Sequence, residues 1–364
     1  HLLYGSDMAA DGAILYHAEA EWMNGCGCMT SQAPAKACYD AHIPYEIASI
    51  DYLLAGNSRG YKFLIVPSCR LLPEKFWAAA ERLKDEGTKI FFIAPEPQRQ
   101  ELPGEVLQLQ ELSARLKALG LCHDYKCGSP LLRIARFDRE AANAFFLFNE
   151  SPQKARERIG FPIKGRYLCL DLLTDCCEYG ETADGTVELE LAPGESKILM
   201  WGALDDDEWE LFPRLRPWRE RPGECVESWD ISIMEQGKTD KFTPYKQGSK
   251  LFNITGKNGL PEFSGQIRYK GRLDLGDGLK DQEELCLDLG QVGTTAELIV
   301  NGQSLGVRIT PPYRFDITGV VEPGVNEIEV VAANTMVHRM QDPLSQFMAI
   351  PPSGMLGPVR LMDR

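Results

Sequence analysis

The feature that most constrains the fold of this chain is an alternation of polar and apolar residues towards its C-terminal end. The stretches 296–300 (AELIV) and 327–331 (EIEVV) alternate as strands do when one face is buried. Asn301-Gly302 follows the first stretch and is a strong hairpin signal, because a type I′ turn needs positive φ at both central residues. Pro323-Gly324 marks another turn before the second stretch. We therefore predict a small all-β sandwich with loops at its ends.

The same region carries a family resemblance. The motifs FSG-x-x-x-Y, LDLG-x-V, AEL-x-VNG-x-x-LGV, PPYRFDIT, EPG-x-NEIEV-x-x-AN and SGMLGPVRL occur in this order. They resemble the galactose-binding-like jelly roll of glycoside hydrolases, most closely the sugar-binding sandwich of family 2 and the C-terminal module of the α-L-rhamnosidase-like family. The resemblance implies a jelly-roll domain over residues 205–364. Its first strand is predicted at Cys225–Met234, with Trp229 in the core.

The N-terminal part of the chain alternates between strand and helix patterns. Strands are predicted at 13–18, 45–50, 63–66, 89–94 and 122–126, and helices at 34–42, 73–87 and 112–119. Gly87 ends the second helix as a helix-stop glycine would. Such alternation predicts a parallel sheet covered by helices. Residues 1–130 resemble the flavodoxin-like amidotransferase domain that follows the catalytic barrel in several β-galactosidase and rhamnosidase families.

Between these two regions the period changes to that of short strands. The segments LLRIARF, AFFLFNES, GRYLCLDLLT and TVELELAPGESKILMWG are separated by turn residues such as Asp184-Gly185 and Pro193-Gly194. We predict a small Ig-like sandwich over residues 131–204. The fold class is therefore multidomain, with one α/β domain and two all-β domains.

Composition excludes some classes of partner and compartment. The net charge is −14, with 39 Lys+Arg against 53 Asp+Glu, which argues against a nucleic-acid or anionic-membrane partner. No run approaches the roughly 20 apolar residues of a membrane span. The 11 cysteines contain no Cys-x-x-Cys pair, which argues against a zinc ribbon and favours free thiols in a reducing compartment. We expect a cytoplasmic location.

Catalytic and cofactor chemistry is not well supported by the sequence. Cys69 follows a strand, where an amidotransferase carries its nucleophile, but it lacks flanking glycines and a downstream His-x-Glu, so a structural role is predicted. Glu19 and Glu21 form a carboxylate pair, but chance produces such pairs in an acidic chain, so solvated or loop carboxylates are predicted. The loop around Gly25 and Gly27 matches no phosphate-binding motif, so no cofactor is predicted. The jelly-roll resemblance allows a structural calcium ion, whose ligands the sequence does not single out.

Sugar binding is the remaining chemistry. The loop 308–314 offers two guanidinium groups, a hydroxyl, a rigid Pro pair and an aromatic ring, which suit the hydroxyls and the face of a pyranose. In family 2 enzymes the matching loop approaches the active site, and the PPYRFDIT match extends this role to Arg308, Tyr313 and Arg314. The alternative is that Tyr313 and Arg314 pack against the sandwich edge or a neighbouring domain.

Three polar residues near this loop are given structural roles. Asp316 is predicted to cap the following turn, and Asn334 is predicted to serve a turn or to cap the backbone. His338 is predicted to be a hydrogen-bonded surface or interface histidine rather than a metal ligand.

The resemblance implies the non-catalytic C-terminal portion of a glycoside hydrolase that acts on O-glycosidic bonds. In these families the catalytic carboxylates lie on a (β/α)₈ barrel, which needs about 250 residues, so we expect the barrel upstream of this chain. The implied partners are a carbohydrate substrate, that barrel and a second copy of the chain. The alternatives are a free-standing carbohydrate-binding module, an oligomerisation module and, last, a degenerate amidotransferase. The sugar, the linkage and the stereochemical course are not encoded in these motifs.

Overall fold

The computed structural model describes residues 7–22, 29–69, 72–121, 126–138, 142–173, 176–202, 204, 208–216, 218–222, 226–276, 284–340 and 350–364. The chain divides into two compact units. The first comprises His1–Leu191 and Ser196–Leu215, and the second comprises Ala192–Glu195 and Arg216–Arg364. The first unit holds a parallel sheet and a small sandwich together, so the predicted domain boundary at residue 130 stays a prediction.

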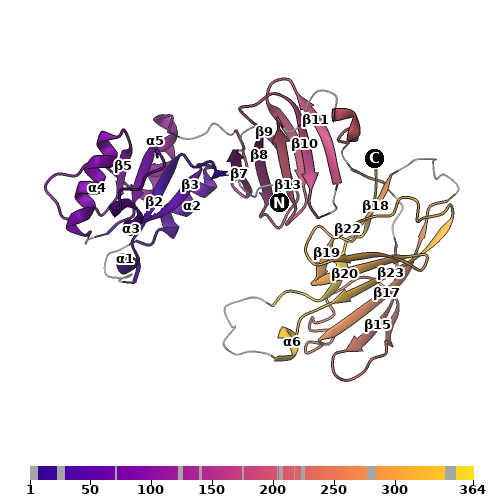
Figure 1. Cartoon of the computed structure of the whole chain (residues 1–364). Helices are drawn as coiled ribbons and strands as arrows, with labels where there is room; N and C mark the ends of the chain where they lie inside the picture. The colour runs from indigo at the N-terminus through magenta and orange to yellow at the C-terminus, as the bar shows by residue number, and fades with distance from the viewer. Residues whose placement is uncertain are drawn as a thin grey trace. The chain divides into compact units, whose positions relative to one another are not determined.

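The first unit contains a five-stranded parallel sheet of order β3-β2-β4-β5-β6 (Figure 1). β4 is buried along its whole length, as expected for an uninterrupted apolar strand. The strand order reverses between β2 and β4, because β3 lies on one side of β2 and β4 on the other. The strands are β2 (Gly12–Tyr16), β3 (Tyr45–Ser49), β4 (Phe63–Val66), β5 (Lys89–Ile93) and β6 (Glu105–Leu107).

Helices cover both faces of this sheet. Leu64 and Val66 of β4 belong to a buried cluster with α3 and α4, whereas Phe63 and Ile65 belong to one with α2 and α5. This confirms the predicted helix-covered parallel sheet. The helices are α1 (Ala18–Trp22), α2 (Gln32–Asp40), α3 (Ile50–Leu54), α4 (Glu74–Asp85), the 3-10 turn η1 (Leu109–Glu111) and α5 (Leu112–Ala118).

The fifth strand of the sheet is not the one predicted. Residues 122–125 of the predicted strand lie outside the described residues, and Lys126 forms an isolated antiparallel bridge with Gly160. The fifth strand is β6, which has only three residues, two of them exposed, and therefore leaves no hydrophobic pattern. Gly104 precedes it and lies so close to β5 that a Cβ there would be 2.2 Å from the carbonyl oxygen of Ile90.

A small sandwich completes the first unit. Its larger sheet has the order β1-β7-β8-β13-β10-β11, and its smaller sheet pairs β9 with β12. Phe145, Phe161 and Tyr167 surround Trp201 with ring centroids 4.9–5.5 Å from its own. The strands are β1 (Asp7–Met8), β7 (Leu132–Asp138), β8 (Asn143–Asn149), β9 (Ala155–Gly160), β10 (Gly165–Asp171), β11 (Cys176–Thr182), β12 (Thr186–Leu191) and β13 (Ser196–Trp201), followed by the 3-10 turn η2 (Glu208–Leu211).

The second unit is a larger antiparallel sandwich. One sheet has the order β16-β15-β17-β23-β20-β21 and the other β14-β25-β18-β22, with β19 and β24 as a separate pair. The strands are β14 (Arg219–Glu220), β15 (Trp229–Glu235), β16 (Thr243–Ser249), β17 (Gly265–Asp274), β18 (Leu285–Asp288), β19 (Gln291–Gly293), β20 (Thr295–Val300), β21 (Gln303–Arg308), β22 (Arg314–Asp316), β23 (Val325–Ala333), β24 (Gly354–Gly357) and β25 (Arg360–Asp363), with the helix α6 (Val337–Met340).

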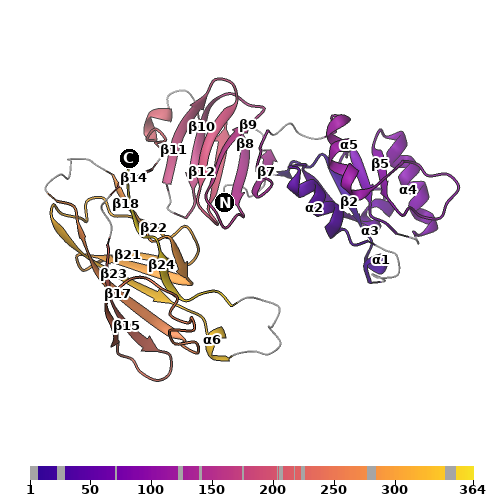
Figure 2. The ribbon, with the colours of Figure 1, turned by 180° about the vertical axis from the view of Figure 1, so that it is seen from behind.

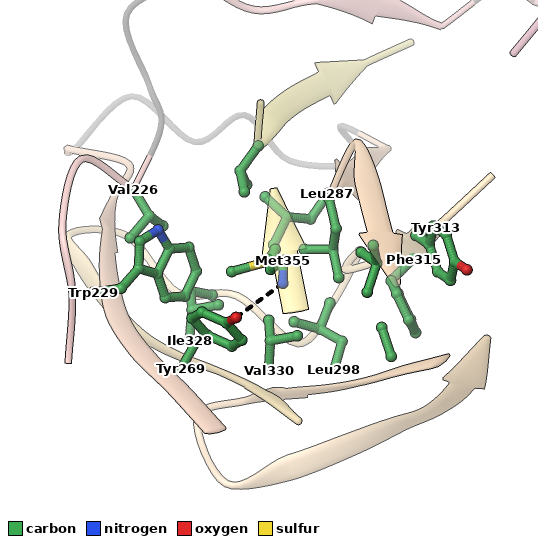
Figure 3. Packing of buried hydrophobic residues seen from close by; sticks show 14 of the residues in the cluster. Val226, Trp229, Tyr269, Leu287, Leu298, Tyr313, Phe315, Ile328, Val330 and Met355 are labelled. Carbon is green, nitrogen blue, oxygen red and sulfur yellow. Dashed lines mark hydrogen bonds between the residues drawn. The ribbon is translucent and has the colours of Figure 1, made fainter. Parts of the chain in front are cut away.

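The core of this sandwich is built around two aromatic residues (Figure 3). Trp229 is 1% exposed and meets the ring of Tyr269 edge-on at 6.2 Å, which confirms its predicted place in the core. The Tyr269 hydroxyl accepts a hydrogen bond of 2.9 Å from the backbone N–H of Met355 on β24. The strand that carries Trp229 begins at that residue, whereas Cys225 lies outside the described residues.

The hairpin predicted at Asn301-Gly302 joins β20 (labelled in Figure 1) to β21 (labelled in Figure 2). Asn301 has φ 50° and Gly302 has φ 82°, the positive values that this turn requires. The Asn301 side chain also accepts a hydrogen bond from the backbone N–H of Glu327 at 2.9 Å. The asparagine therefore contributes both its backbone conformation and its amide to the turn.

Candidate functional site

The predicted sugar-binding loop leads from the end of β21 into β22. Tyr313 is 4% exposed, and its ring belongs to the buried core of the sandwich (Figure 3). Its hydroxyl donates to the backbone carbonyl of Thr294 at 2.6 Å, and burial raises the pKa of the phenol. The ring thus packs within the protein and exposes little surface on which a sugar could stack.

Arg314 is held by two carboxylates. Its Nε lies 3.1 Å from Asp288 Oδ2 and its Nη1 lies 3.4 Å from Glu195 Oε2, with only 12% of the side chain exposed. Burial alone would lower the pKa of the guanidinium, but the charges of Glu195 and Asp288 outweigh burial and raise it. The Glu195 carboxylate also accepts the backbone N–H of Ala192 at 2.6 Å. Arg314 is therefore part of a closed ionic cluster.

Arg308 is the more accessible of the two arginines. It is half-buried, its Nε donates to the Arg314 carbonyl at 3.3 Å, and its guanidinium lies 5.3 Å from the centre of the Phe315 ring. Thr310, between the two arginines, is exposed. The structure thus brings the two arginines together, and the sugar-binding role of Arg308, Tyr313 and Arg314 stays a prediction.

A second polar cluster lies just after the last residue of β23. Asn334 accepts a hydrogen bond from the backbone N–H of Gly265 at 2.8 Å and donates to the Phe263 carbonyl at 2.8 Å, which confirms its predicted role toward the backbone. It also donates to Ser353 Oγ at 2.9 Å, and the same oxygen lies 2.8 Å from His338 Nε2.

The structure corrects the expected position of His338. It is buried, with 8% of its surface exposed, and its Nε2 contacts Ser353 Oγ. Burial lowers the pKa of its imidazole, and a hydrogen bond with the Pro351 backbone partly offsets this. The prediction for Asp316 is confirmed, since its Oδ1 accepts the backbone N–H of Thr318 at 2.8 Å.

At the carboxyl edge of the parallel sheet the structure brings together residues that the sequence analysis had treated separately. His17, Glu21 and Cys69 line a small cavity where the strand order reverses between β2 and β4. Cys69 is 4% exposed, as suits a structural cysteine. Glu21 accepts the backbone N–H of Ser31 at 2.8 Å, whereas the Glu19 side chain is 69% exposed. His17 was missed as a neighbour of Cys69 because it precedes that residue in the chain.

Other classes of site find little support in the part of the chain that the structure describes. Within it, three or more His, Cys, Asp or Glu side chains nowhere gather in a geometry suited to a metal ion. Across the same residues, each helix is too short or too polar to cross a membrane.

Comparison with known proteins shows which solved structure has a similar fold. No family model matches the chain. In a rhamnosidase from Novosphingobium sp. PP1Y, the match covers 100% of this chain and 40% of that chain, with a TM-score of 0.64 and 18% sequence identity. The chain shares its fold with part of a rhamnosidase.

A curated protein is also similar in sequence. It is a "Putative beta-glucuronidase" of Formosa agariphila, 34% identical over 114 residues, which amount to 31% of this chain and 10% of that protein. The chain thus spans less than half of either protein. The two similarities support a relationship to glycoside hydrolases.

Proposed function

We propose that the chain is the non-catalytic C-terminal portion of a glycoside hydrolase that cleaves O-glycosidic bonds. The observation that carries the proposal is the similarity of the whole chain to 40% of a rhamnosidase, supported by the local sequence similarity to a β-glucuronidase. The first unit would be the amidotransferase-like and Ig-like domains, and the second the galactose-binding-like jelly roll.

In this proposal the chemistry takes place on a (β/α)₈ barrel upstream of the chain. The parallel sheet described here has five strands, whereas such a barrel has eight. A pair of carboxylates on the barrel would protonate the leaving oxygen and stabilise or attack the anomeric carbon, while water supplies the new hydroxyl. This chain would support the barrel and place the 308–314 loop near the substrate, where Arg308 and Thr310 remain accessible.

Hydrolysis assays on nitrophenyl glycosides test the proposal. The chain alone should release no nitrophenol from α-L-rhamnoside, β-D-glucuronide or β-D-galactoside. Co-expressed with the barrel that the proposal places upstream, it should copurify with that barrel and increase its activity or its half-life at elevated temperature. Hydrolysis by this chain alone, or a barrel indifferent to its presence, would overturn the assignment.

Two further parts of the proposal concern location and assembly. We place the protein in the cytoplasm, which is supported by the free thiols of Cys127, Cys176, Cys177 and Cys286. A second copy of the chain is proposed as a partner, and sedimentation velocity over a tenfold range of concentration would detect it.

A further inference from the structure

A segment of the second unit is positively charged although the chain as a whole is acidic. Residues 236–258 contain five lysines and one aspartate, in a protein of net charge −14. Lys238 forms an ion pair with Glu235 at 2.7 Å. Among the described residues, the other four lysines have no ion-pair partner, and all four are exposed: Lys241, Lys246, Lys250 and Lys257. This segment therefore presents unpaired positive charge to the solvent.

Two aromatic rings lie within the same segment. Tyr245 on β16 and Phe252 after it have ring centroids 6.5 Å apart and planes tilted by 34°. Both rings are half-buried against the core of the sandwich, and β16 is the outer strand of its sheet. The ammonium of Lys246 lies 4.0 Å from the centre of the Phe252 ring and 5.7 Å from that of Tyr245. We call Tyr245, Lys246 and Phe252 the β16 edge site.

The backbone around these rings is fixed by hydrogen bonds. Asn253, next to Phe252, accepts the backbone N–H of Ser353 at 2.9 Å through its side chain. Gly248 donates its backbone N–H to Asp230 Oδ1 at 2.9 Å, which ties the strand β16 to its neighbour β15. The rings are therefore held in place before any ligand arrives, which reduces the entropy lost on binding.

The polar groups of the β16 edge site are available to a ligand. Within the described part of the chain, neither the Tyr245 hydroxyl nor the Lys246 ammonium has a hydrogen-bond or ion-pair partner in the protein. The Lys246 ammonium covers one face of the Phe252 ring, so the half-buried Tyr245 ring offers the apolar surface for the face of a sugar ring. The Tyr245 hydroxyl and the Lys246 ammonium offer donors to the substituents of that sugar. A cation next to an aromatic platform favours a sugar that carries a negative charge.

We infer that the β16 edge site binds an anionic carbohydrate, one whose sugar units carry a carboxylate or sulfate group. The sugar ring lies against Tyr245, and its anionic group contacts the Lys246 ammonium that Phe252 holds beside it. The neighbouring lysines attract the polymer at longer range. A nucleic acid also combines charge with flat rings, but a duplex carries about one phosphate charge per 1.7 Å of its length. A sugar polymer with one anionic group per unit is less densely charged, so the acidic remainder of the chain would repel it less. The choice of a carbohydrate as the ligand rests on the proposed function. The charge and the ring geometry of the site are independent of that proposal.

Affinity electrophoresis in gels that contain polygalacturonate tests this inference. The chain should be retarded by polygalacturonate and much less by its methyl-esterified, uncharged form. Lys246→Gln should weaken retention about fivefold, the effect of one cation–anion contact in water. Tyr245→Phe keeps the half-buried ring and removes the hydroxyl, so it should weaken retention while leaving the unfolding temperature close to that of the parent protein. Lys270→Gln is the charge-matched control, because Lys270 lies on β17 and pairs with Glu329 at 3.0 Å; it should retain the parent affinity.

Several outcomes would overturn the inference. These are equal retention by the charged and esterified polymers, equal losses in the Lys246 and Lys270 variants, or the absence of retention. A single-stranded DNA oligonucleotide bound more tightly than polygalacturonate, with the same sensitivity to Lys246→Gln, would assign the site to nucleic acid instead. None of these results bears on the hydrolysis assay above, so failure of this site and failure of the proposed function remain distinguishable.

Discussion

Nη1 of Arg314 lies 3.4 Å from Oε2 of Glu195, although the two residues are 119 positions apart in the chain. Glu195 is 1% exposed and belongs to the short segment Ala192–Glu195 that forms part of the second unit. Asp288 completes the cluster, with its Oδ2 3.1 Å from Nε of the same guanidinium. The sequence motif that contains Arg314 suggests a ligand-binding arginine, whereas its contacts in the structure are those of a structural ion cluster.

Removing Arg314 should destabilise the second unit strongly. In Arg314→Ala the buried carboxylates of Glu195 and Asp288 lose their counter-charge, at a cost of about 3–5 kcal/mol in the free energy of unfolding. Pulse proteolysis in urea, with fragments of the second unit followed by mass spectrometry, would measure this loss for that unit separately. Arg308→Ala is the matched control and should cost less than about 1 kcal/mol, because that guanidinium makes one long hydrogen bond and is partly exposed. Equal effects of the two variants would contradict the cluster.

The Tyr313 hydroxyl should matter for stability. Tyr313→Phe keeps the ring but removes the donor to the Thr294 carbonyl, which should cost about 0.5–1.5 kcal/mol. Thermal unfolding with and without L-rhamnose, D-galactose and D-glucose separates this role from sugar binding. If the ring is purely structural, any stabilisation by sugar should be the same in both proteins; a sugar-dependent shift that disappears in Tyr313→Phe would instead support the predicted contact with substrate.

The sequence predicts features that depend on neighbouring residues better than contacts between residues that are far apart in the chain. The hairpin at Asn301-Gly302 depends on two adjacent residues, and Trp229 lies in a strand pattern that needs only its neighbours. The partner of Arg314 could not be predicted, because Glu195 lies in a distant turn with no local motif. The sequence left the direction of Tyr313 open between a ligand and the sandwich edge, since the preceding Pro311-Pro312 interrupts the alternation from which a buried face is recognised.

Burial should make Cys286 nearly inert toward alkylation. Desolvation is the main cause that raises the pKa of this thiol to about 12, so very little thiolate exists at pH 8. Cys176, at the start of β11, is exposed and serves as the comparison. Iodoacetamide labelling followed by peptide mass mapping should modify Cys176 in the native protein and Cys286 only after denaturation. Equal rates at both positions in the native protein would contradict the burial of β18.

Stability should fall in mild acid, and His338 should account for part of that fall. Burial is the main cause that holds the pKa of its imidazole below the ordinary value of 6.5, so the unfolded chain binds a proton more readily than the folded one. The contribution of neutral His338 is therefore complete above pH 6.5 and is lost as the pH falls toward the lowered pKa of the folded state. The pKa of His42 in the first unit is also lowered, mainly through burial.

Pulse proteolysis in urea between pH 5 and pH 7.5, with fragments of the second unit followed by mass spectrometry, would resolve the contribution of His338. In His338→Gln the amide can still bond to Ser353 but cannot titrate, so the decline of stability toward acid should be shallower than in the parent protein. His42→Gln is the matched control, because it removes a comparable buried imidazole from the first unit and should leave that pH dependence unchanged. A parent-like decline in His338→Gln would show that other groups carry the acid sensitivity of this unit.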